Sequence, residues 1–114
     1  MTTADKIEEK TIKSALSDLK NRLSGLLGDK LELFVLFGSR ARGDYDLDSD
    51  IDIAVVVRGL NRELRKNIYE KTASVELEYL VPISCILLSA EEYRKLLKRE
   101  RRLALDIKKE GIPL

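Results

Sequence analysis

Histidine and tryptophan are absent from this chain of 114 residues, and cysteine occurs once, at Cys85. Without histidine, the chain can form neither a Ser-His nor a Cys-His nucleophile, and no Cys/His cluster is available for zinc. A single cysteine excludes a disulfide within the chain. These absences remove the commonest nucleophile and zinc schemes before any motif is considered.

Long apolar runs and an imbalance of charge are absent as well. The longest apolar stretches fall far short of a membrane span, and the first five residues do not resemble a signal peptide. The 21 basic and 20 acidic residues nearly cancel, so no global field attracts nucleic acid or a membrane surface. We therefore expect a cytoplasmic protein of one domain, residues 1–114, without a membrane partner and without nucleic acid as its direct substrate.

Hydrophobic spacing predicts a compact α/β domain with the order α-β-loop-β-α-β-α. The expected segments are a helix at 5–27, a strand at 31–37, a polar loop at 38–49, a strand at 50–57, a helix at about 60–79, a strand at 82–88 and one or two helices ending near 110. Residues 75–79 alternate between apolar and acidic, so a strand is an alternative there. Ser89 and Glu92 have the spacing of a capping box at the start of the last helical region.

The polar loop begins with Gly38-Ser39, directly after the first expected strand. Glycine lets the backbone bend tightly and approach a ligand, and Ser39 can cap a short helical turn whose N–H groups favour an anion. Arg40 and Arg42 add positive charge beside that turn. Together these residues indicate a cradle for phosphate groups.

Asp50 and Asp52 stand two residues apart at the start of the second expected strand. Their carboxylates should project from one face, ~6–7 Å apart at the backbone, while Ile51 and Ile53 point into the core. Carboxylates at this spacing repel each other unless a cation lies between them. Magnesium is commonly held by one or two carboxylates together with substrate phosphates, so the loop predicts a site for Mg²⁺ and a nucleoside triphosphate.

Each element also has a plain structural interpretation. Ser39 could be only a helix cap, Arg40 and Arg42 could be solvated or paired with nearby aspartates, and the Asp-Ile-Asp alternation could be the wet face of a strand. A calcium-binding EF-hand loop is excluded. A loop starting at Asp44 would need glycine and glutamate where Ser49 and Val55 stand.

Taken together, Gly38-Ser39, ten intervening residues and Asp50-Ile51-Asp52 resemble the signature of the DNA polymerase β-like nucleotidyltransferase superfamily. Within it, the runs Gly-Ser-Arg-Ala-Arg-Gly and Ser-Asp-Ile-Asp-Ile look like the minimal nucleotidyltransferases, or MNT proteins. The C-terminal segment 107–112 is similar to the usual ending of that family. The resemblance implies a small mixed sheet flanked by helices.

The resemblance also implies a set of functional residues and partners. It places Gly38, Ser39, Arg40, Arg42 and Ser49 at the nucleotide, with Ser39 on the triphosphate. It makes Asp50 and Asp52 the catalytic pair and the Mg²⁺ ligands, with ATP or another NTP as the substrate. The implied reaction moves a nucleoside monophosphate to a hydroxyl and releases pyrophosphate. Many relatives act with a HEPN-domain protein as toxin–antitoxin pairs, in which the MNT member is the antitoxin; a homo-oligomer is a further expectation.

One departure from the family pattern concerns the third carboxylate of active members, which completes the metal site and deprotonates the acceptor hydroxyl. The strand expected to supply it, residues 82–88, contains no acid, and Ser84 or Cys85 stands near its place. Glu76 or Glu78 could substitute only if residues 75–79 form a strand beside the aspartates. We interpret Cys85 as a core residue rather than a nucleophile, because no histidine can activate it.

Two functions therefore compete. The first is Mg²⁺-dependent transfer of AMP from ATP to a hydroxyl of a partner protein. The second is a catalytically degenerate module that binds nucleotide or protein and neutralises its partner by contact. The missing third carboxylate favours the second, because a neutral hydroxyl is a poor general base.

Overall fold

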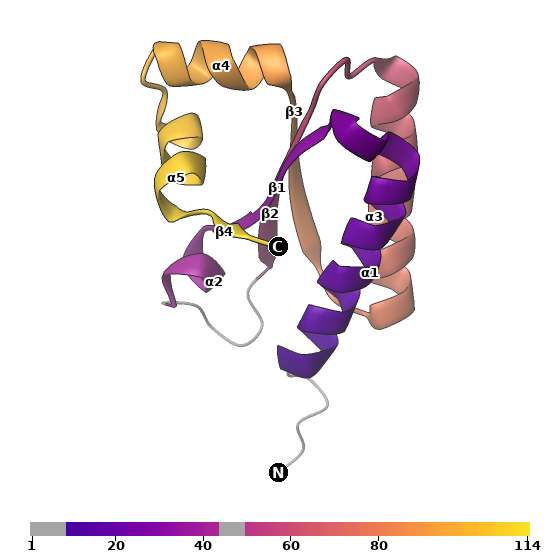
Figure 1. Ribbon diagram of the computed structural model, residues 1–114. Helices are drawn as coiled ribbons and strands as arrows, with labels where there is room; N and C mark the ends of the chain where they lie inside the picture. Colours follow the sequence, from indigo (N-terminus) through magenta and orange to yellow (C-terminus); the bar gives the residue numbers. More distant parts are fainter. Residues whose placement is uncertain (1–8, 44–49) are drawn as a thin grey trace.

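The computed structural model describes residues 9–43 and 50–114, which form a four-stranded mixed sheet with helices on both faces (Figure 1). The helices are α1 (Glu9–Leu27), α2 (Ser39–Arg42), α3 (Arg62–Tyr79), α4 (Ala90–Lys98) and α5 (Arg102–Glu110), with a 3-10 turn at Gly28–Lys30. The strands are β1 (Leu31–Phe37), β2 (Ile51–Val57), β3 (Ile83–Ser89) and β4 (Ile112–Pro113). The expected fold, a mixed sheet flanked by helices, is confirmed.

The strands follow the order β3-β2-β1-β4 across the sheet. β1 pairs antiparallel with β2, and β2 pairs parallel with β3 because α3 returns the chain to the same end of the sheet. β4 pairs antiparallel with β1, where Pro113 stands opposite Val35. The sequence did not predict β4, since two residues are too few for an alternating pattern to be recognised.

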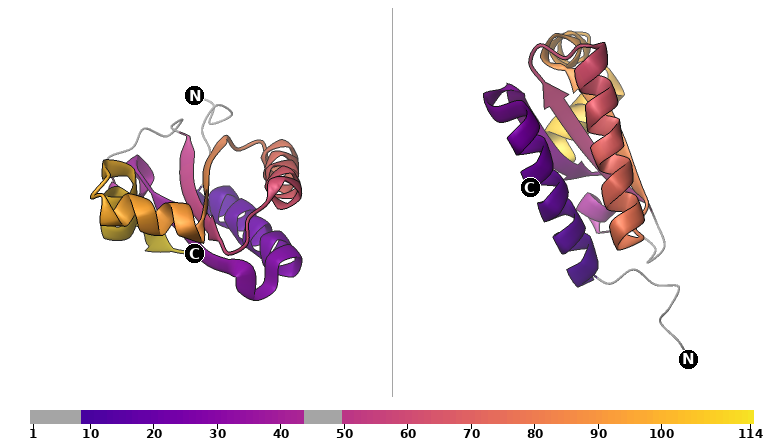
Figure 2. Two further views of the ribbon diagram at one scale, coloured as in Figure 1. Left: turned by 90° about the horizontal axis from the view of Figure 1, so that it is seen from above. Right: turned by 90° about the vertical axis from the view of Figure 1, so that its right-hand side faces the viewer.

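α1 and α3 lie side by side over one face of the sheet (Figures 1 and 2). The buried side of α1 repeats at spacings of three and four, as an amphipathic helix requires. It consists of Ile12, Ala15, Leu16, Leu19, Leu23 and Leu27. From the sheet, Ile51, Ile53, Val55 and Val57 pack into the same core. These are alternate residues of β2, so the side chains between them face the opposite side of the sheet.

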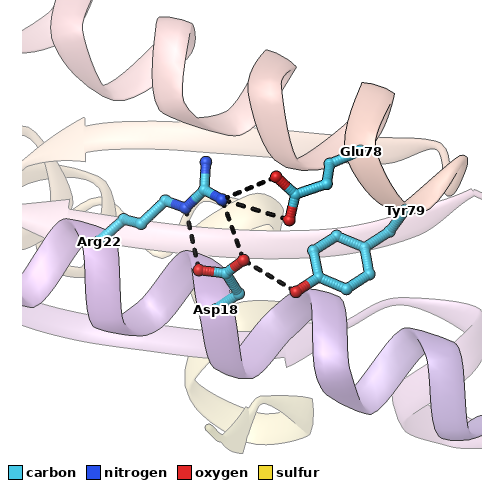
Figure 3. Close-up of polar contacts among 4 residues, drawn as sticks. All are labelled: Asp18, Arg22, Glu78 and Tyr79. Atoms are coloured by element: carbon cyan, nitrogen blue, oxygen red, sulfur yellow. Dashed lines mark hydrogen bonds and ion pairs between the residues drawn. The ribbon is translucent and has the colours of Figure 1, made fainter.

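Four polar side chains join α1 to the end of α3 (Figure 3). Arg22 Nε lies 2.9 Å from Asp18 Oδ1, and Arg22 Nη2 lies 3.2 Å from Glu78 Oε1. The Tyr79 hydroxyl donates to Asp18 Oδ2 over 2.8 Å. These contacts fix which side of α3 faces α1.

The second face of the sheet is covered by α4, α5 and the short helix α2 (Figure 1). Val35, Ala54 and Ile107 form the buried centre of this layer. α4 begins with the predicted capping box. Ser89 Oγ accepts a hydrogen bond from the Glu92 N–H over 3.0 Å, and Glu92 Oε1 accepts one from the Ser89 N–H over 2.9 Å.

Within the described residues, the predicted helices and strands agree with this arrangement, with one correction, whereas residues 44–49 of the predicted polar loop lie outside the described part of the chain. Residues 75–79 are helical, so the alternative of a strand there is wrong. Val75 is buried whereas Leu77 is exposed, because residues two apart point in nearly opposite directions on a helix but to the same face on a strand. The first four residues of the predicted helix at 5–27 lie outside the described residues. None of the helices in residues 9–43 and 50–114 has the length and apolar composition of a membrane span.

Candidate functional site

Gly38 forms the sharp turn between β1 and α2. Its φ is +76°, a left-handed conformation that side-chain-bearing residues rarely adopt. The Arg42 N–H donates to the Gly38 carbonyl over 3.0 Å and closes the single turn of α2. A Cβ on Gly38 would lie 2.7 Å from Oδ2 of Asp52. The missing side chain therefore lets the turn lie directly against the Asp52 carboxylate.

Asp50 and Asp52 are placed by the start of β2. Asp52 stands opposite Phe37 in the antiparallel pairing with β1, and the Ile51 N–H donates to the Pro82 carbonyl over 3.0 Å. Ile51 is fully buried on the side of α1 and α3, as predicted. By alternation, Asp52 projects from the other face of the sheet, where it is half-buried, whereas Asp50 is exposed.

The electrostatic surroundings of Asp52 disfavour its charged form. Burial raises the pKa of its carboxyl, and repulsion from Asp50 raises that pKa further. A hydrogen bond from Ser84 and the positive charge of Arg42 act in the opposite direction and lower it. The pKa of Asp52 remains above its ordinary value, because the Ser84 hydroxyl and the Arg42 charge do not fully offset burial and repulsion. A cation placed between Asp50 and Asp52 would relieve this repulsion.

The register of β3 identifies the residue beside Asp52. Ser84 pairs with Asp52 and Cys85 pairs with Ile53 in the parallel ladder between β2 and β3. Ser84 therefore shares the face of Asp52, and it is Ser84 rather than Cys85 that stands in the expected place of the third carboxylate. Cys85 packs against the core beneath α3, where burial raises the pKa of its thiol to about 12.

Glu76 and Glu78 are held elsewhere. Glu76 Oε2 accepts a hydrogen bond from the Ile83 N–H over 3.0 Å, on the side of the sheet that α3 covers. Glu78 pairs with Arg22 of α1 (Figure 3). Neither carboxylate lies beside Asp52 on its face of the sheet. Within residues 9–43 and 50–114, no group of three acidic, cysteine or histidine side chains is arranged to hold a metal.

The two predicted arginines take different positions. Arg40 is almost fully buried, and its Nη1 lies 3.7 Å from Glu9 Oε1 at the start of α1. Arg42 is half-exposed, with Nη1 3.2 Å from Glu110 Oε1 at the end of α5, and its charge acts on Asp52. Arg42 therefore stands at the site. Contact of either arginine with a nucleotide stays a prediction.

Two serines complete the set of predicted residues. A short helical turn is present as predicted, but Ser39 is its first residue and not its cap, because the carbonyl that accepts the Arg42 N–H belongs to Gly38; the Ser39 side chain lies outside what the structure describes. Ser49 lies outside the described residues altogether. The fold thus brings together Gly38, Asp52 and Ser84, with Asp50 and Arg42 close enough to act on the Asp52 charge.

This arrangement offers oxygen ligands beside a glycine turn and a cation. Asp50 and Asp52 supply hard carboxylate oxygens of the kind that suits Mg²⁺ when a substrate phosphate provides further ligands. Arg42 supplies positive charge that suits an anionic group. Carboxylates for a metal and a cation for phosphate are the two requirements of a site that binds a metal–nucleotide complex.

Comparison with known proteins supports the same conclusion. The family described as "Nucleotidyltransferase domain" matches residues 10–112. The chain is 38% identical over 84 residues to "Putative protein adenylyltransferase MJ0141" of Methanocaldococcus jannaschii, and this alignment covers 73% of this chain and 80% of that protein. It is 47% identical over 49 residues to "Putative protein adenylyltransferase MJ0604" of the same organism, and this alignment covers 43% of this chain and 45% of that protein.

A solved structure has the same fold. The crystal structure of a "putative nucleotidyltransferase" from Sulfolobus solfataricus aligns with a TM-score of 0.51 and 24% identity, covering 93% of this chain and 86% of the other. This similarity concerns the fold alone, whereas the family match and the first relative extend over most of the sequence. The chain belongs to the nucleotidyltransferase domain family.

Proposed function

We propose that this protein binds ATP with Mg²⁺ beside Gly38, Asp50 and Asp52 and transfers AMP to a hydroxyl of a partner protein. The observation that carries the proposal is the approach of the Gly38 turn to Asp52, at 2.7 Å from a Gly38 Cβ position to Oδ2. This approach places the start of α2 directly beside the carboxylates. The printed names of the two Methanocaldococcus relatives, both of which refer to protein adenylyl transfer, support the type of reaction and of acceptor.

Asp50 and Asp52 would hold the magnesium ion. Their mutual repulsion and their hard oxygen atoms fit a divalent cation, and the exposure of Asp50 leaves room for substrate phosphates as further ligands. Magnesium bound there would offset the negative charge of the triphosphate and of the pyrophosphate that leaves. Arg42 adds a fixed positive charge on the same side.

In the proposed transfer, the acceptor oxygen forms a bond to the α-phosphorus of ATP. The bond from that phosphorus to the oxygen bridging the β-phosphate breaks, and pyrophosphate leaves with the electron pair. The acceptor proton passes to a base. Ser84, which occupies the place beside Asp52, is a neutral hydroxyl and a poor base, so we expect transfer to be slow.

The acceptor that the family resemblance implies is a HEPN-domain protein. In this role the chain would be the antitoxin of a toxin–antitoxin pair, and modification of a partner hydroxyl would inactivate the toxin. This assignment rests on the family resemblance of the Gly-Ser-Arg-Ala-Arg-Gly and Ser-Asp-Ile-Asp-Ile runs alone.

A second candidate function is favoured by Ser84. If no base completes the site, the chain would bind nucleotide or partner and neutralise the partner by contact alone. Ser84 beside Asp52 is the specific observation for this candidate, because a carboxylate at that position would supply both a base and a further metal ligand.

Transfer of label from α-labelled ATP to a purified HEPN-domain partner tests the proposal, together with calorimetric titration of Mg²⁺-ATP. We compare the wild type with Asp52→Asn, and use Asp29→Asn as a control, because Asp29 lies in the exposed turn before β1. Labelling that Asp52→Asn abolishes and Asp29→Asn preserves supports the enzyme. Binding of Mg²⁺-ATP without labelling supports the second candidate, and absence of binding overturns the nucleotide site itself.

A further inference from the structure

Glu110, the last residue of α5, carries a charge that its own helix does not favour. The C-terminal end of a helix has a partial negative charge, so cations are favoured there and carboxylates are not. Lys108 and Lys109 follow this preference in the last turn of α5, whereas Glu110 at its end does not. The stabilising contacts of the Glu110 carboxylate therefore lie outside its helix.

The partner of Glu110 lies on α2, 68 positions earlier in the sequence. Arg42 Nη1 donates a hydrogen bond to Glu110 Oε1 over 3.2 Å, so the end of α5 meets the end of α2 (Figure 1). The side chain of Glu110 is 27% exposed and that of Arg42 45%. Both charges are partly shielded from water, so their attraction is screened less than that of a fully exposed pair.

The backbone holds Glu110 tightly against the sheet. The Gly111 N–H donates to the Ile107 carbonyl over 3.0 Å, and a Cβ on Gly111 would collide with that same oxygen. The added Cβ would also lie 3.0 Å from Cγ2 of Val35, a buried residue of β1. Only glycine lets the chain leave α5 this close to β1, so the position of Glu110 is set by the same contact.

The short strand β4 directs the end of α5 toward the site. Ile112 pairs with Leu36 in the antiparallel ladder between β4 and β1. Continued by two residues beyond Leu36, this register brings Glu110 toward Gly38, where β1 turns into α2. The register thus explains why an acidic residue at the end of α5 meets α2.

α2 is a single turn and depends on contacts from other elements. A helix of four residues forms too few internal hydrogen bonds to be stable by itself. Two of its side chains contact distant elements. Arg40 lies beside Glu9 of α1, and Arg42 lies beside Glu110 of α5. The direction of the Arg42 side chain is therefore set by α5 as well as by the turn that carries it.

The turn that carries Arg42 is the one that approaches Asp52. The Arg42 N–H donates to the Gly38 carbonyl over 3.0 Å, and a Cβ on Gly38 would lie 2.7 Å from Asp52 Oδ2. A guanidinium has five N–H donors in one plane, so it can hold a carboxylate with one nitrogen and a phosphate along another edge. Arg42 can thus contact Glu110 and an anionic ligand at the same time.

We propose that Glu110 is a positioning residue for the nucleotide, which holds the Arg42 guanidinium beside the carboxylates in an orientation that binds the phosphates of ATP. The inference rests on the proposed function, because it concerns the same site. Without Glu110, Arg42 keeps its charge but loses a fixed orientation, and the cost of ordering a long side chain then weakens nucleotide binding. A carboxylate without this role would act in the opposite direction, since its charge repels the triphosphate.

The affinity for Mg²⁺-ATP, measured by calorimetric titration in a double-mutant cycle, tests the proposal. Glu110→Gln should weaken binding about three- to tenfold, which corresponds to the ordering of one long side chain. Arg42→Gln should weaken it at least about tenfold, and Glu110→Gln should add nothing in that background. Glu91→Gln on α4 is the matched control and should bind as the wild type does, because α4 begins at the opposite end of β3 from Ser84.

Tighter or unchanged binding in Glu110→Gln overturns the proposal, and so does an equal loss with and without the Arg42 side chain. Exchange of the two charges, Arg42→Glu with Glu110→Arg, separates positioning from a purely structural link between α2 and α5. The exchanged pair should regain the melting temperature that Glu110→Arg alone loses, but not the affinity for Mg²⁺-ATP. Recovery of that affinity would show that the pair only joins the two helices. Should the exchanged pair fail to fold, the cycle decides alone.

The wild type and Asp52→Asn distinguish this inference from the proposed function. Binding of Mg²⁺-ATP that Asp52→Asn abolishes and Glu110→Gln leaves intact overturns the positioning role alone. A wild type that does not bind Mg²⁺-ATP overturns the proposed function, and the positioning role with it. Thermal melting establishes that each variant is folded at the temperature of the titration.

Discussion

Ser84 stands beside Asp52 in the parallel pairing of β2 with β3, and its hydroxyl forms a hydrogen bond with the Asp52 carboxylate. The bond lowers the pKa of Asp52 and so favours its charged form. A hydroxyl at this position stabilises the charged form of Asp52 but adds no negative charge that could bind a metal ion. It also offers no base to an acceptor hydroxyl.

Replacement of Ser84 by aspartate tests whether a missing base limits transfer. Ser84→Asp is expected to raise the rate of AMP transfer, by roughly a hundred- to ten-thousandfold, because general bases typically contribute that much. The same change places a second carboxylate beside Asp52, so the variant without ligand should melt at a lower temperature and regain stability with Mg²⁺. The rate is measured as label incorporated from α-labelled ATP.

Ser84→Asn is the matched control, since it has similar size and hydrogen-bonding capacity without the charge. It should leave the transfer rate at or below that of the wild type. An unchanged rate in Ser84→Asp, with folding intact and wild-type transfer dependent on Asp52, would show that this position is not the place of the missing base.

Gly38→Ala tests the contact between the glycine turn and Asp52. Left-handed backbone at residue 38 costs a side-chain-bearing residue roughly 1–2 kcal/mol. The new Cβ would also lie 2.7 Å from Asp52 Oδ2 and displace the carboxylate. Gly59→Ala, at φ +69° and with open space around its Cβ, carries the backbone cost alone. Only Gly38→Ala should weaken Mg²⁺-ATP binding in a calorimetric titration, and equal weakening in both variants would contradict the proposed contact.

Most of the fold could be predicted from local patterns. The apolar spacing of three and four from Ile12 to Leu26 predicts α1, because burial of one side imposes a period that the sequence must follow. Short apolar runs predict β1, which glycine bounds, and β3, which Pro82 precedes. The capping box at Ser89 and Glu92 depends on contacts within four residues, so it could be predicted from the sequence. β4 depends on pairing with Val35, nearly eighty residues earlier, and leaves no local pattern.

The site was predictable in its residue types but not in its neighbours. The position of Asp52 on the face opposite Ile51 and Ile53 follows from strand alternation, whereas Asp50 stands one residue before β2. Whether Ser84 or Cys85 faces Asp52 depends on the register of β3 against β2, and a slip of one residue would exchange them. The pairing of Arg42 with Glu110 likewise depends on how α5 packs against β1, which no local pattern records.

The Cys85 thiol is expected to resist modification in the folded protein. Burial raises its pKa from 9.0 to about 12, so at pH 8 the folded chain holds about a thousandfold less thiolate than the unfolded chain. A disulfide reagent should react rapidly in denaturant and very slowly without it. Ser84→Cys combined with Cys85→Ser moves the thiol to the opposite face and should react faster than the wild type. Rapid reaction of native Cys85 would contradict the core position.

The cluster that joins α1 to α3 should give stability a dependence on pH at both extremes. The hydrogen bond with Arg22 lowers the pKa of Asp18 below 3.8, so this contribution is present above that value and is lost as the pH falls through the folded pKa. The hydrogen bond to Asp18 raises the pKa of Tyr79 above 10.0, so its contribution is lost at alkaline pH instead. Asp18→Asn should flatten both limbs of a plot of melting temperature against pH, whereas Asp106→Asn in the exposed pair with Arg102 should not.

Removal of the Asp52 charge should have opposite effects with and without ligand. Burial and repulsion from Asp50 raise the folded pKa of Asp52, which means that its charge opposes folding once the pH exceeds the unfolded pKa. Asp52→Asn should therefore raise the melting temperature slightly at neutral pH without ligand, and the difference should vanish in acid, where both side chains are neutral. Mg²⁺-ATP at a hundredfold excess over its dissociation constant should stabilise the wild type by ~2.7 kcal/mol and the variant by much less. Differential scanning fluorimetry measures both effects, and an equal ligand-induced gain in wild type and Asp52→Asn would show that Asp52 does not hold the metal–nucleotide complex.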